Sequence, residues 1–319
     1  MKLYSSSFLL ILLLVLSVNA SVVDKIKDLI GLSSDKDLSP IYEKNSVRNI
    51  KYGGSSAGYL DVYYDENNIK NLKPVIIFLH GGAWITGTKD DYALTGNYFQ
   101  NEGYVVVHPN YVLFPKGNME EMVNDVYQAI QWTFKNVKHF GGNNKKITLV
   151  GYSAGAHLMA LTTLKSALRM ENLEKNLEPL PKVEKLVLFN CPFDFNDYDA
   201  IFQIFGEADT RKIENGFLKS VASYLFNSND IGPTDILQGL ENNANKDFGF
   251  QKINVFHGGK DKIIPSYSAE NFINNINRVS PKIKVNDIYQ PSYGHKTLIY
   301  GALGNHEEMK QLFLDIIQM

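Results

Sequence analysis

One stretch of the chain, residues 147–164, constrains the fold more than any other. It reads ITLVGYSAGAHLMALTTL: an apolar run typical of a strand, the motif GYSAG around Ser153, and small and apolar residues typical of a helix. Gly151 and Gly155 permit a sharp turn between the two elements. We therefore predict that Ser153 stands on this turn, with its hydroxyl lifted clear of a sheet and the positive end of a helix dipole beneath it.

Apolar runs of strand length recur along the chain and alternate with stretches long enough for helices. One such stretch, Met119 to Lys138, keeps apolar residues near one helical face and can begin at Asn118 or at Lys116-Gly117. The alternation predicts an α/β fold with a mostly parallel central sheet, helices on both faces, and ligands beyond the carboxyl ends of the strands. The predicted strands are residues 59–64, 74–80, 104–109, 146–151, 183–190, 252–258 and 282–289.

Size and charge narrow the class of protein. A chain of 319 residues, of which 44% are hydrophobic and 21% charged, has ordinary globular composition and can bury a large core. Its formal net charge is −2, and it has no basic block that would attract nucleic acid or an anionic membrane. The single cysteine, Cys191, cannot form an intramolecular disulfide, and we interpret it as a buried small residue. We therefore expect a core-stabilised protein with no nucleic-acid partner.

The first 20 residues have the layout of a secretory signal peptide. Lys2 precedes an apolar run from Phe8 to Val18, and Ala20 is a small residue suited to cleavage. The alternative is an uncleaved signal anchor, although the run is shorter than the ~20 residues that a membrane span needs. We expect a protein of the secretory pathway, secreted or in an endomembrane lumen. If the segment is retained, the protein is instead associated with the ER or Golgi membrane.

The rest of the chain divides into a leader, residues 21–48, and a main domain, residues 49–319. Within the main domain, residues 192–250 interrupt the alternation of strands and helices with Asp, Asn, Gly and aromatic residues. We interpret this segment as an insertion that caps one edge of the sheet.

Asp261 and His295, which come much later in the chain than Ser153, complete a candidate site for nucleophilic catalysis. A serine hydroxyl is a weak nucleophile at neutral pH and needs a general base that an acid holds in place. Asp261 follows one predicted strand and His295 follows the next, so both should lie at the carboxyl edge of the sheet with Ser153. We predict that the three side chains meet there, with His295 as base and Asp261 as orienting acid.

Other histidines and acids are weaker candidates. His257 is a reserve base, and Asp194 and Asp235 are reserve acids, although such acids more often cap helices. The remaining histidines are expected to shape a loop (His80), to pack on a helix (His157), to end a strand (His108) or to lie at the surface (His139 and His306).

A second motif, HGGAW at residues 80–84, follows the predicted strand 74–80. Acyl transfer develops an oxyanion, which backbone N–H donors stabilise. Gly81 and Gly82 have no side chains to block an approaching carbonyl, so we expect their amides and that of Ala154 to form an oxyanion hole. Trp84 and the aromatic insertion suggest an apolar or aromatic substrate, with Trp84 in contact with it.

These motifs together resemble the α/β-hydrolase superfamily. The HGGAW form, HPNYVLFPKG at residues 108–117 and GYSAGAHL at residues 151–158 are similar to the esterase group of prenylcysteine methylesterases and kynurenine formamidases, near the hormone-sensitive-lipase type. The resemblance runs from about Gly58 to the carboxyl terminus. It implies Ser153 as nucleophile, His295 as base and acid, Asp261 as orienting acid and the HGGAW loop as oxyanion hole.

The expected function is that of a serine esterase, which cleaves carboxylic esters of small molecules through an acyl-enzyme intermediate. One alternative is hydrolysis of an aryl formamide, as by a kynurenine formamidase, and another is a binding module that keeps the fold without catalysis. This chemistry needs no cofactor. No metal is expected either, since the chain lacks H-E-x-x-H and cysteine-rich spacing.

Overall fold

The computed structural model describes residues 45–195, 230–304 and 306–319. Eight strands form one sheet in the order β1-β2-β4-β3-β5-β8-β9-β10. β1 and β4 run antiparallel to β2, and all other neighbours are parallel. The strands are β1 (Ser46–Lys51), β2 (Tyr59–Tyr63), β3 (Lys73–Leu79), β4 (Val105–Pro109), β5 (Gly142–Tyr152), β8 (Lys185–Phe189), β9 (Lys252–Gly258) and β10 (Lys284–Gln290). A separate two-stranded ribbon pairs β6 (Glu171–Asn172) with β7 (Lys175–Asn176).

The register of the parallel strands brings their carboxyl ends to one edge. Leu79 of β3 lies opposite Gly151 of β5, and Tyr152 lies opposite Phe189 of β8. Phe189 in turn lies opposite Phe256 of β9. Loops that leave β3, β5, β8, β9 and β10 therefore start side by side, although their sequences lie far apart.

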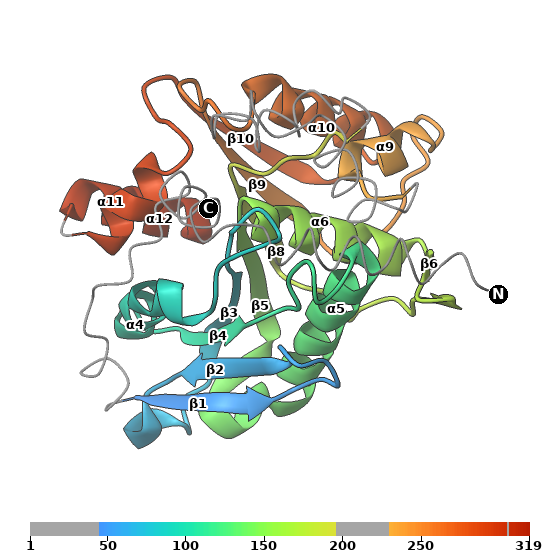
Figure 1. Ribbon diagram of the computed structural model, residues 1–319. Coiled ribbons are helices and arrows are strands. Elements are labelled where there is room, and N and C mark those ends of the chain that lie inside the picture. The colour runs from blue at the N-terminus through green and yellow to red at the C-terminus, as the bar shows by residue number, and fades with distance from the viewer. Residues whose placement is uncertain (1–44, 196–229, 305) are drawn as a thin grey trace.

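Helices cover both faces of this sheet (Figure 1). One side carries α4 (Ala93–Asn101), α11 (Thr297–Leu303) and α12 (Glu307–Gln318), and the other carries α5 (Met119–Asn136), α6 (Ala154–Ala167), α9 (Pro233–Gln238) and α10 (Ser266–Val279). Three single turns of 3-10 helix complete the described elements: η1 (Glu66–Asn68), η2 (Asp90–Tyr92) and η3 (Val137–Phe140). Because both faces are covered, the central strands β4, β8 and most of β3 and β9 are buried continuously, as their apolar runs predict.

The local predictions hold with small shifts at their ends. Each predicted strand is present, and the predicted helix from Met119 begins where Asn118 caps it through a capping box with Glu121. That helix ends at Asn136, two residues early, and continues as η3. Cys191 is buried, as expected. The structure adds β1, which starts at Ser46, so the sheet begins before the expected domain boundary at residue 49.

Three predicted segments fall wholly or partly outside the described residues. The signal peptide and most of the leader lie in residues 1–44, and the central part of the insertion lies in residues 196–229. The described stems of the insertion belong to the core, because the ring of Phe193 stacks on Phe272 of α10 with centroids 4.1 Å apart. Its function as a cap stays a prediction.

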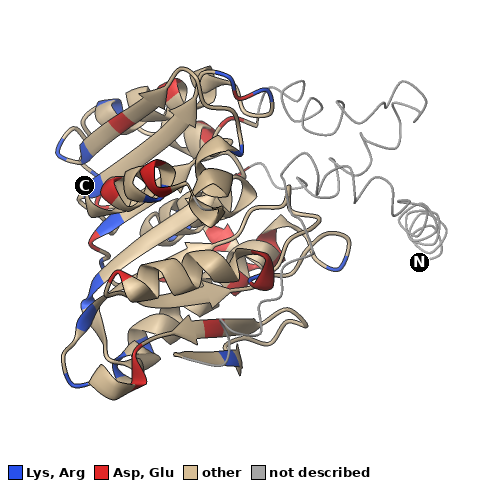
Figure 2. Cartoon of the chain, turned by 90° about the vertical axis from the view of Figure 1, so that its left-hand side faces the viewer, with Lys and Arg blue, Asp and Glu red and all other residues tan. Residues whose placement is uncertain are grey.

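Charged residues of both signs are interspersed over the described elements (Figure 2). Within residues 45–195, 230–304 and 306–319, no helix combines the length and the apolar character that crossing a bilayer requires.

The contact between α6 and the end of β3 should tolerate no side chain. A methyl group added at Gly155 would overlap the backbone oxygens of Leu79 and His80. We expect Gly155→Ala to lower the free energy of unfolding by about 3 kcal/mol, because neither backbone can move aside cheaply. Gly54→Ala is the matched control, since a methyl there meets no atom within 4 Å. Equal urea midpoints for the two variants would contradict this packing.

Candidate active site

Ser153 occupies a strained turn between β5 and α6. β5 ends at Tyr152 and α6 begins at Ala154, so one residue makes the connection, with φ 53° and ψ −122°. A side chain at Gly151 would overlap the backbone of Ala156, and one at Gly155 would overlap the end of β3. The two glycines therefore allow α6 to pack against the sheet closely enough to hold Ser153 in this conformation.

The three predicted catalytic side chains meet at the carboxyl edge of the sheet. Ser153 Oγ lies 3.0 Å from His295 Nε2, and His295 Nδ1 lies 2.8 Å from Asp261 Oδ2. The side chains of His295 and Asp261 are 3% and 1% exposed. A proton on Nδ1 would bond to the carboxylate and leave the Nε2 lone pair for the serine hydroxyl. This arrangement can accept the serine proton during nucleophilic attack.

Asp261 is held as a carboxylate by donors on every side. Oδ1 accepts hydrogen bonds from the amides of Ile263 (2.8 Å) and Ile264 (2.9 Å), and Oδ2 accepts one from Asn190 Nδ2 (2.9 Å) beside that of His295. Burial alone would raise the pKa of Asp261, but its interactions with His295 and the two amides bring the pKa below its ordinary value. The carboxylate therefore stays charged while it orients the imidazole.

Asn190 is a site residue that the sequence analysis missed. It follows the last residue of β8 with φ 48°, a left-handed conformation that asparagine tolerates, and its side chain reaches Asp261. Its signal was available, since a polar residue directly after a buried strand lies at the same edge as Ser153 and Asp261.

Tyr152 is a second site residue that the sequence analysis missed. Its hydroxyl donates a hydrogen bond to the backbone oxygen of His295 at 3.1 Å, and the two rings lie with centroids 5.3 Å apart. The phenol is buried, and burial raises its pKa well above the ordinary value, so it remains a donor. Tyr152 thus ties the loop that carries His295 to the strand that carries Ser153.

The HGGAW loop passes directly beside the serine. A methyl group at Gly81 would lie 3.2 Å from Ser153 Cβ, and one at Gly82, with φ 138°, would overlap the carbonyl of Thr86. Among the residues that the structure describes, no hydrogen-bond acceptor is found for the amides of Gly81, Gly82, Ala83 or Ala154. These amides include all three predicted oxyanion donors and add Ala83, which the sequence analysis did not single out.

His80 shapes this loop, as predicted. Its Nδ1 lies 2.8 Å from the carbonyl of Gly81, and its ring stacks on Tyr111 with centroids 4.5 Å apart. Burial lowers the pKa of His80 to about 4, although the bond to Gly81 opposes the change. The imidazole is therefore neutral, and its Nδ1–H group donates to the carbonyl of Gly81. Because the Gly81 carbonyl and the Gly82 amide belong to one peptide plane and point oppositely, fixing the carbonyl also directs the amide.

Trp84, the expected substrate contact, is buried in the structure. Its indole is 1% exposed and donates from Nε1 to Nδ1 of His157 at 3.2 Å. His157 Nε2 lies 2.7 Å from the carbonyl of Ile231, so both ring nitrogens of His157 are engaged. Burial lowers the pKa of His157 to about 4. The burial of both rings favours a structural role for Trp84, and His157 is packed on its helix as expected.

The reserve candidates form hydrogen bonds with other groups. His257 pairs with Asp287 of β10 through a 2.8 Å contact. Asp194 accepts a hydrogen bond from Asn271, and Asp235 accepts one from the amide of Phe195. Neither acid hydrogen-bonds His295. Among the described residues, no group of three His, Cys, Asp or Glu side chains is placed to hold a metal ion.

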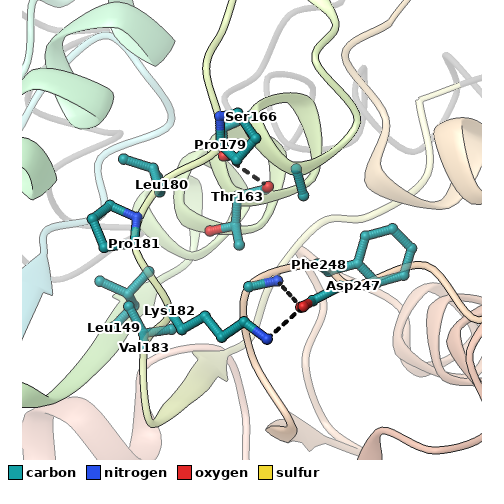
Figure 3. A pocket seen from close by; sticks show the side chains of 12 residues that line it. Leu149, Thr163, Ser166, Pro179, Leu180, Pro181, Lys182, Val183, Asp247 and Phe248 are labelled. Atoms are coloured by element: carbon teal, nitrogen blue, oxygen red, sulfur yellow. Dashed lines mark hydrogen bonds and ion pairs between the residues drawn. The ribbon is translucent and has the colours of Figure 1, made fainter.

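A cavity of about 260 Å³ lies at the other end of α6 (Figure 3). It is lined in part by Thr163 and Ser166, which follow Ser153 along the helix by about 15 Å and about 20 Å at 1.5 Å per residue. Lys182 and Asp247 form an ion pair of 2.6 Å at this cavity. It is therefore separate from the serine site.

The donors around Asp261 can be tested through its titration. We expect Asn190→Asp to raise the pKa of Asp261 by about one unit or more, because it replaces a donor 2.9 Å away by a second negative charge. The pKa would be measured from the carboxyl carbon shifts of aspartate-labelled protein. Asn243→Asp is the matched control, since Asn243 is also left-handed (φ 54°) and is exposed. An unchanged Asp261 titration in the Asn190 variant would show that this contact is unimportant.

The buried neutral histidines should make the protein sensitive to acid. Because the folded pKa of His157 is about 4, below the ~6.5 of an unfolded histidine, its contribution to stability is present above pH 6.5 and is lost as the pH falls toward 4. We expect the free energy of unfolding to fall less between pH 7 and 4.5 in His157→Gln than in the unmodified protein. The full difference is on the order of 3 kcal/mol, and urea titrations measure it. His139→Gln, at an exposed position, should retain the original pH dependence.

Known proteins are similar to this chain over 36% to 77% of its length. The isoprenylcysteine alpha-carbonyl methylesterase of Arabidopsis thaliana is 28% identical over 247 residues, which cover 77% of this chain and 56% of that protein. The kynurenine formamidase of Salmo salar is 34% identical over 116 residues, 36% of this chain and 38% of that protein. The chain thus spans about half the length, or less, of these curated relatives.

A solved structure and a family model also match this chain. The crystal structure of Esterase B from Lactobacillus rhamnosis superimposes with a TM-score of 0.64 at 14% identity, over 93% of this chain and 94% of that one. The predicted α/β-hydrolase fold is therefore confirmed. The BD-FAE family model matches residues 60–276, more than half of the chain. This protein is a member of the BD-FAE family with an α/β-hydrolase fold.

Proposed function

We propose that the protein is a serine hydrolase that cleaves carboxylic esters through an acyl-enzyme intermediate. The observation that carries this proposal is the unbroken series of contacts from Ser153 Oγ through His295 to Asp261, beside backbone amides that lack an acceptor among the described residues. Membership of the BD-FAE family and similarity to a methylesterase and to a solved esterase support it.

The first half of the reaction forms the acyl-enzyme. His295 Nε2 takes the proton of Ser153 as its oxygen attacks the ester carbonyl, and Asp261 stabilises the imidazolium that results. The negative charge that develops on the carbonyl oxygen faces the amides of the HGGAW loop, at Gly81, Gly82 and Ala83, and the amide of Ala154. The intermediate then collapses, and His295 gives its proton to the departing alkoxide.

The second half releases the acid. A water molecule enters where the alcohol left, and His295 takes one of its protons as the water oxygen attacks the acyl carbonyl. The same amides stabilise the second oxyanion, and the proton on His295 returns to Ser153 as the acid departs. The cycle consumes one ester and one water, yields one alcohol and one acid, and uses this chain's own side chains for every proton transfer.

The substrate in this proposal is a small-molecule ester, and an aryl formamide is the second candidate. Similarity to a kynurenine formamidase favours the formamide, although it covers only 36% of the chain. The aromatic preference expected from Trp84 receives no support from its buried indole. We retain entry into the secretory pathway as part of the proposal, on the basis of residues 1–20 alone.

The chemistry can be tested with p-nitrophenyl acetate and a fluorophosphonate probe. We expect the unmodified protein to turn over the ester and to be labelled at Ser153, and Ser153→Ala to lose the label and at least about 10⁴-fold in kcat/KM. Ser166→Ala is the matched control, because Ser166 is a buried serine of α6 that lies about 20 Å along the helix from Ser153.

Two outcomes would change the proposal. Faster cleavage of N-formylkynurenine than of simple esters would select the formamide alternative. Absence of both labelling and turnover in folded protein would support a binding module instead.

A further inference from the structure

The loop that carries the oxyanion donors adopts a backbone that side chains disfavour. Gly82, Ala83 and Trp84 have φ values of 138°, 50° and 63°, three successive residues in the left-handed half of conformational space. Only the first is a glycine, and residues with side chains persist there when surrounding contacts hold them. Within the loop, the carbonyl of Gly82 accepts hydrogen bonds from the amides of Ile85 (3.1 Å) and Thr86 (3.0 Å). Contacts with other parts of the fold add to this support.

The contacts of Trp84 supply that support. Its carbonyl accepts a hydrogen bond from the amide of Phe114 at 2.9 Å, and its indole nitrogen donates to His157 Nδ1 at 3.2 Å. The indole and imidazole meet edge to face, with centroids 5.4 Å apart, and the ring of Phe195 packs against both. Trp84 and His157 are 1% and 0% exposed, so water has little access to replace their hydrogen bond.

His157 joins this loop to the nucleophile. Its own amide donates to the carbonyl of Ser153 at 3.0 Å, because it lies one helical turn after the serine on α6. The same residue thus holds the Ser153 backbone with its main chain and the Trp84 indole with its side chain. The bond from Nε2 to the carbonyl of Ile231 fixes the ring from its other side.

We propose that Trp84 and His157 are positioning residues, whose hydrogen bond sets the distance between Ser153 and the oxyanion-binding amides of Gly82 and Ala83. The inference rests on the proposed ester hydrolysis. Neither side chain transfers a proton: the Trp84 indole is only a donor, and both nitrogens of His157 are already engaged. They act through the loop backbone, by holding two amides where negative charge develops in the transition state.

The central variant is Trp84→Phe, which keeps an aromatic ring and removes the indole donor. We expect kcat/KM for p-nitrophenyl acetate to fall about 10- to 100-fold, since a small misplacement of oxyanion donors is costly. A trifluoromethyl ketone forms a hemiketal with serine, and the oxygen of this hemiketal would occupy the position of the transition-state oxyanion. Its inhibition constant should rise by a similar factor. The dependence of kcat/KM on pH should keep the same midpoint on its acid side, because the contacts of His295 and Asp261 are not altered. Trp132→Phe is the matched control, as Trp132 packs on Phe140 away from Ser153.

Two substitutions of His157 separate positioning from general stability. Asparagine can place an acceptor near the position of Nδ1 and so retain the bond from Trp84, whereas glutamine can place a donor near Nε2 and retain only the bond to Ile231. We expect His157→Asn to keep more activity than His157→Gln, even where their melting temperatures are equal. The double variant Trp84→Phe/His157→Gln should be no less active than the worse single variant, because both changes remove one interaction.

The results distinguish this inference from the proposed function. An active unmodified protein whose Trp84→Phe variant keeps kcat/KM and ketone affinity within twofold overturns the positioning role alone. If Trp84→Phe does not fold, equal activity of the two His157 variants overturns it. An unmodified protein without turnover or labelling at Ser153 overturns both proposals. A parallel loss of kcat/KM and ketone affinity supports them together.

Discussion

The site depends on one close contact, in which α6 packs against the ends of β3 and β5 without a side chain between them. Gly151 lies against the backbone of Ala156, and Gly155 lies against the carbonyls of Leu79 and His80. This approach holds Ser153 in a left-handed backbone at the carboxyl edge of the sheet. Since the helix begins at the next residue, the amide of Ala154 is placed beside the serine by the same turn. The positions of the Ser153 hydroxyl and of the Ala154 amide thus share a single structural cause.

A buried polar network then brings the other groups to the serine. His295 belongs to the segment between β10 and α11, and three contacts hold it: its backbone bonds Tyr152, Nδ1 bonds Asp261 and Nε2 bonds Ser153. Asp261 is held in turn by Asn190 and by two amides of its own loop. Hydrogen bonds in such a dry environment are electrostatically strong, and an unpaired member would be costly, so the network favours one arrangement.

The buried histidines differ in what their ring nitrogens bond, and this difference separates structural from chemical roles. His157 uses both nitrogens to connect Trp84 with Ile231, and His80 uses Nδ1 to hold the Gly81 carbonyl. Burial lowers the pKa of both to about 4, which leaves them neutral at neutral pH. His295 alone among these three has a nitrogen directed at a serine hydroxyl, with the other held by a carboxylate. The roles that we propose for these three histidines therefore follow from their hydrogen-bond partners, because the residue type is the same.

The sequence by itself determined the strand, GYSAG turn and helix, and it placed Asp261 and His295 at the ends of successive strands. These features follow from short-range patterns, and the carboxyl ends of parallel strands necessarily share an edge.

Only the tertiary structure decided which side chains meet across the fold. Tyr152 reaches His295 over 143 positions, Trp84 reaches His157 over 73, and Asn190 reaches Asp261 over 71. No local pattern specifies such contacts, because they depend on the packing of elements that become neighbours only when the sheet forms. Trp84, the expected substrate contact, likewise packs against rings that lie far from it in the sequence.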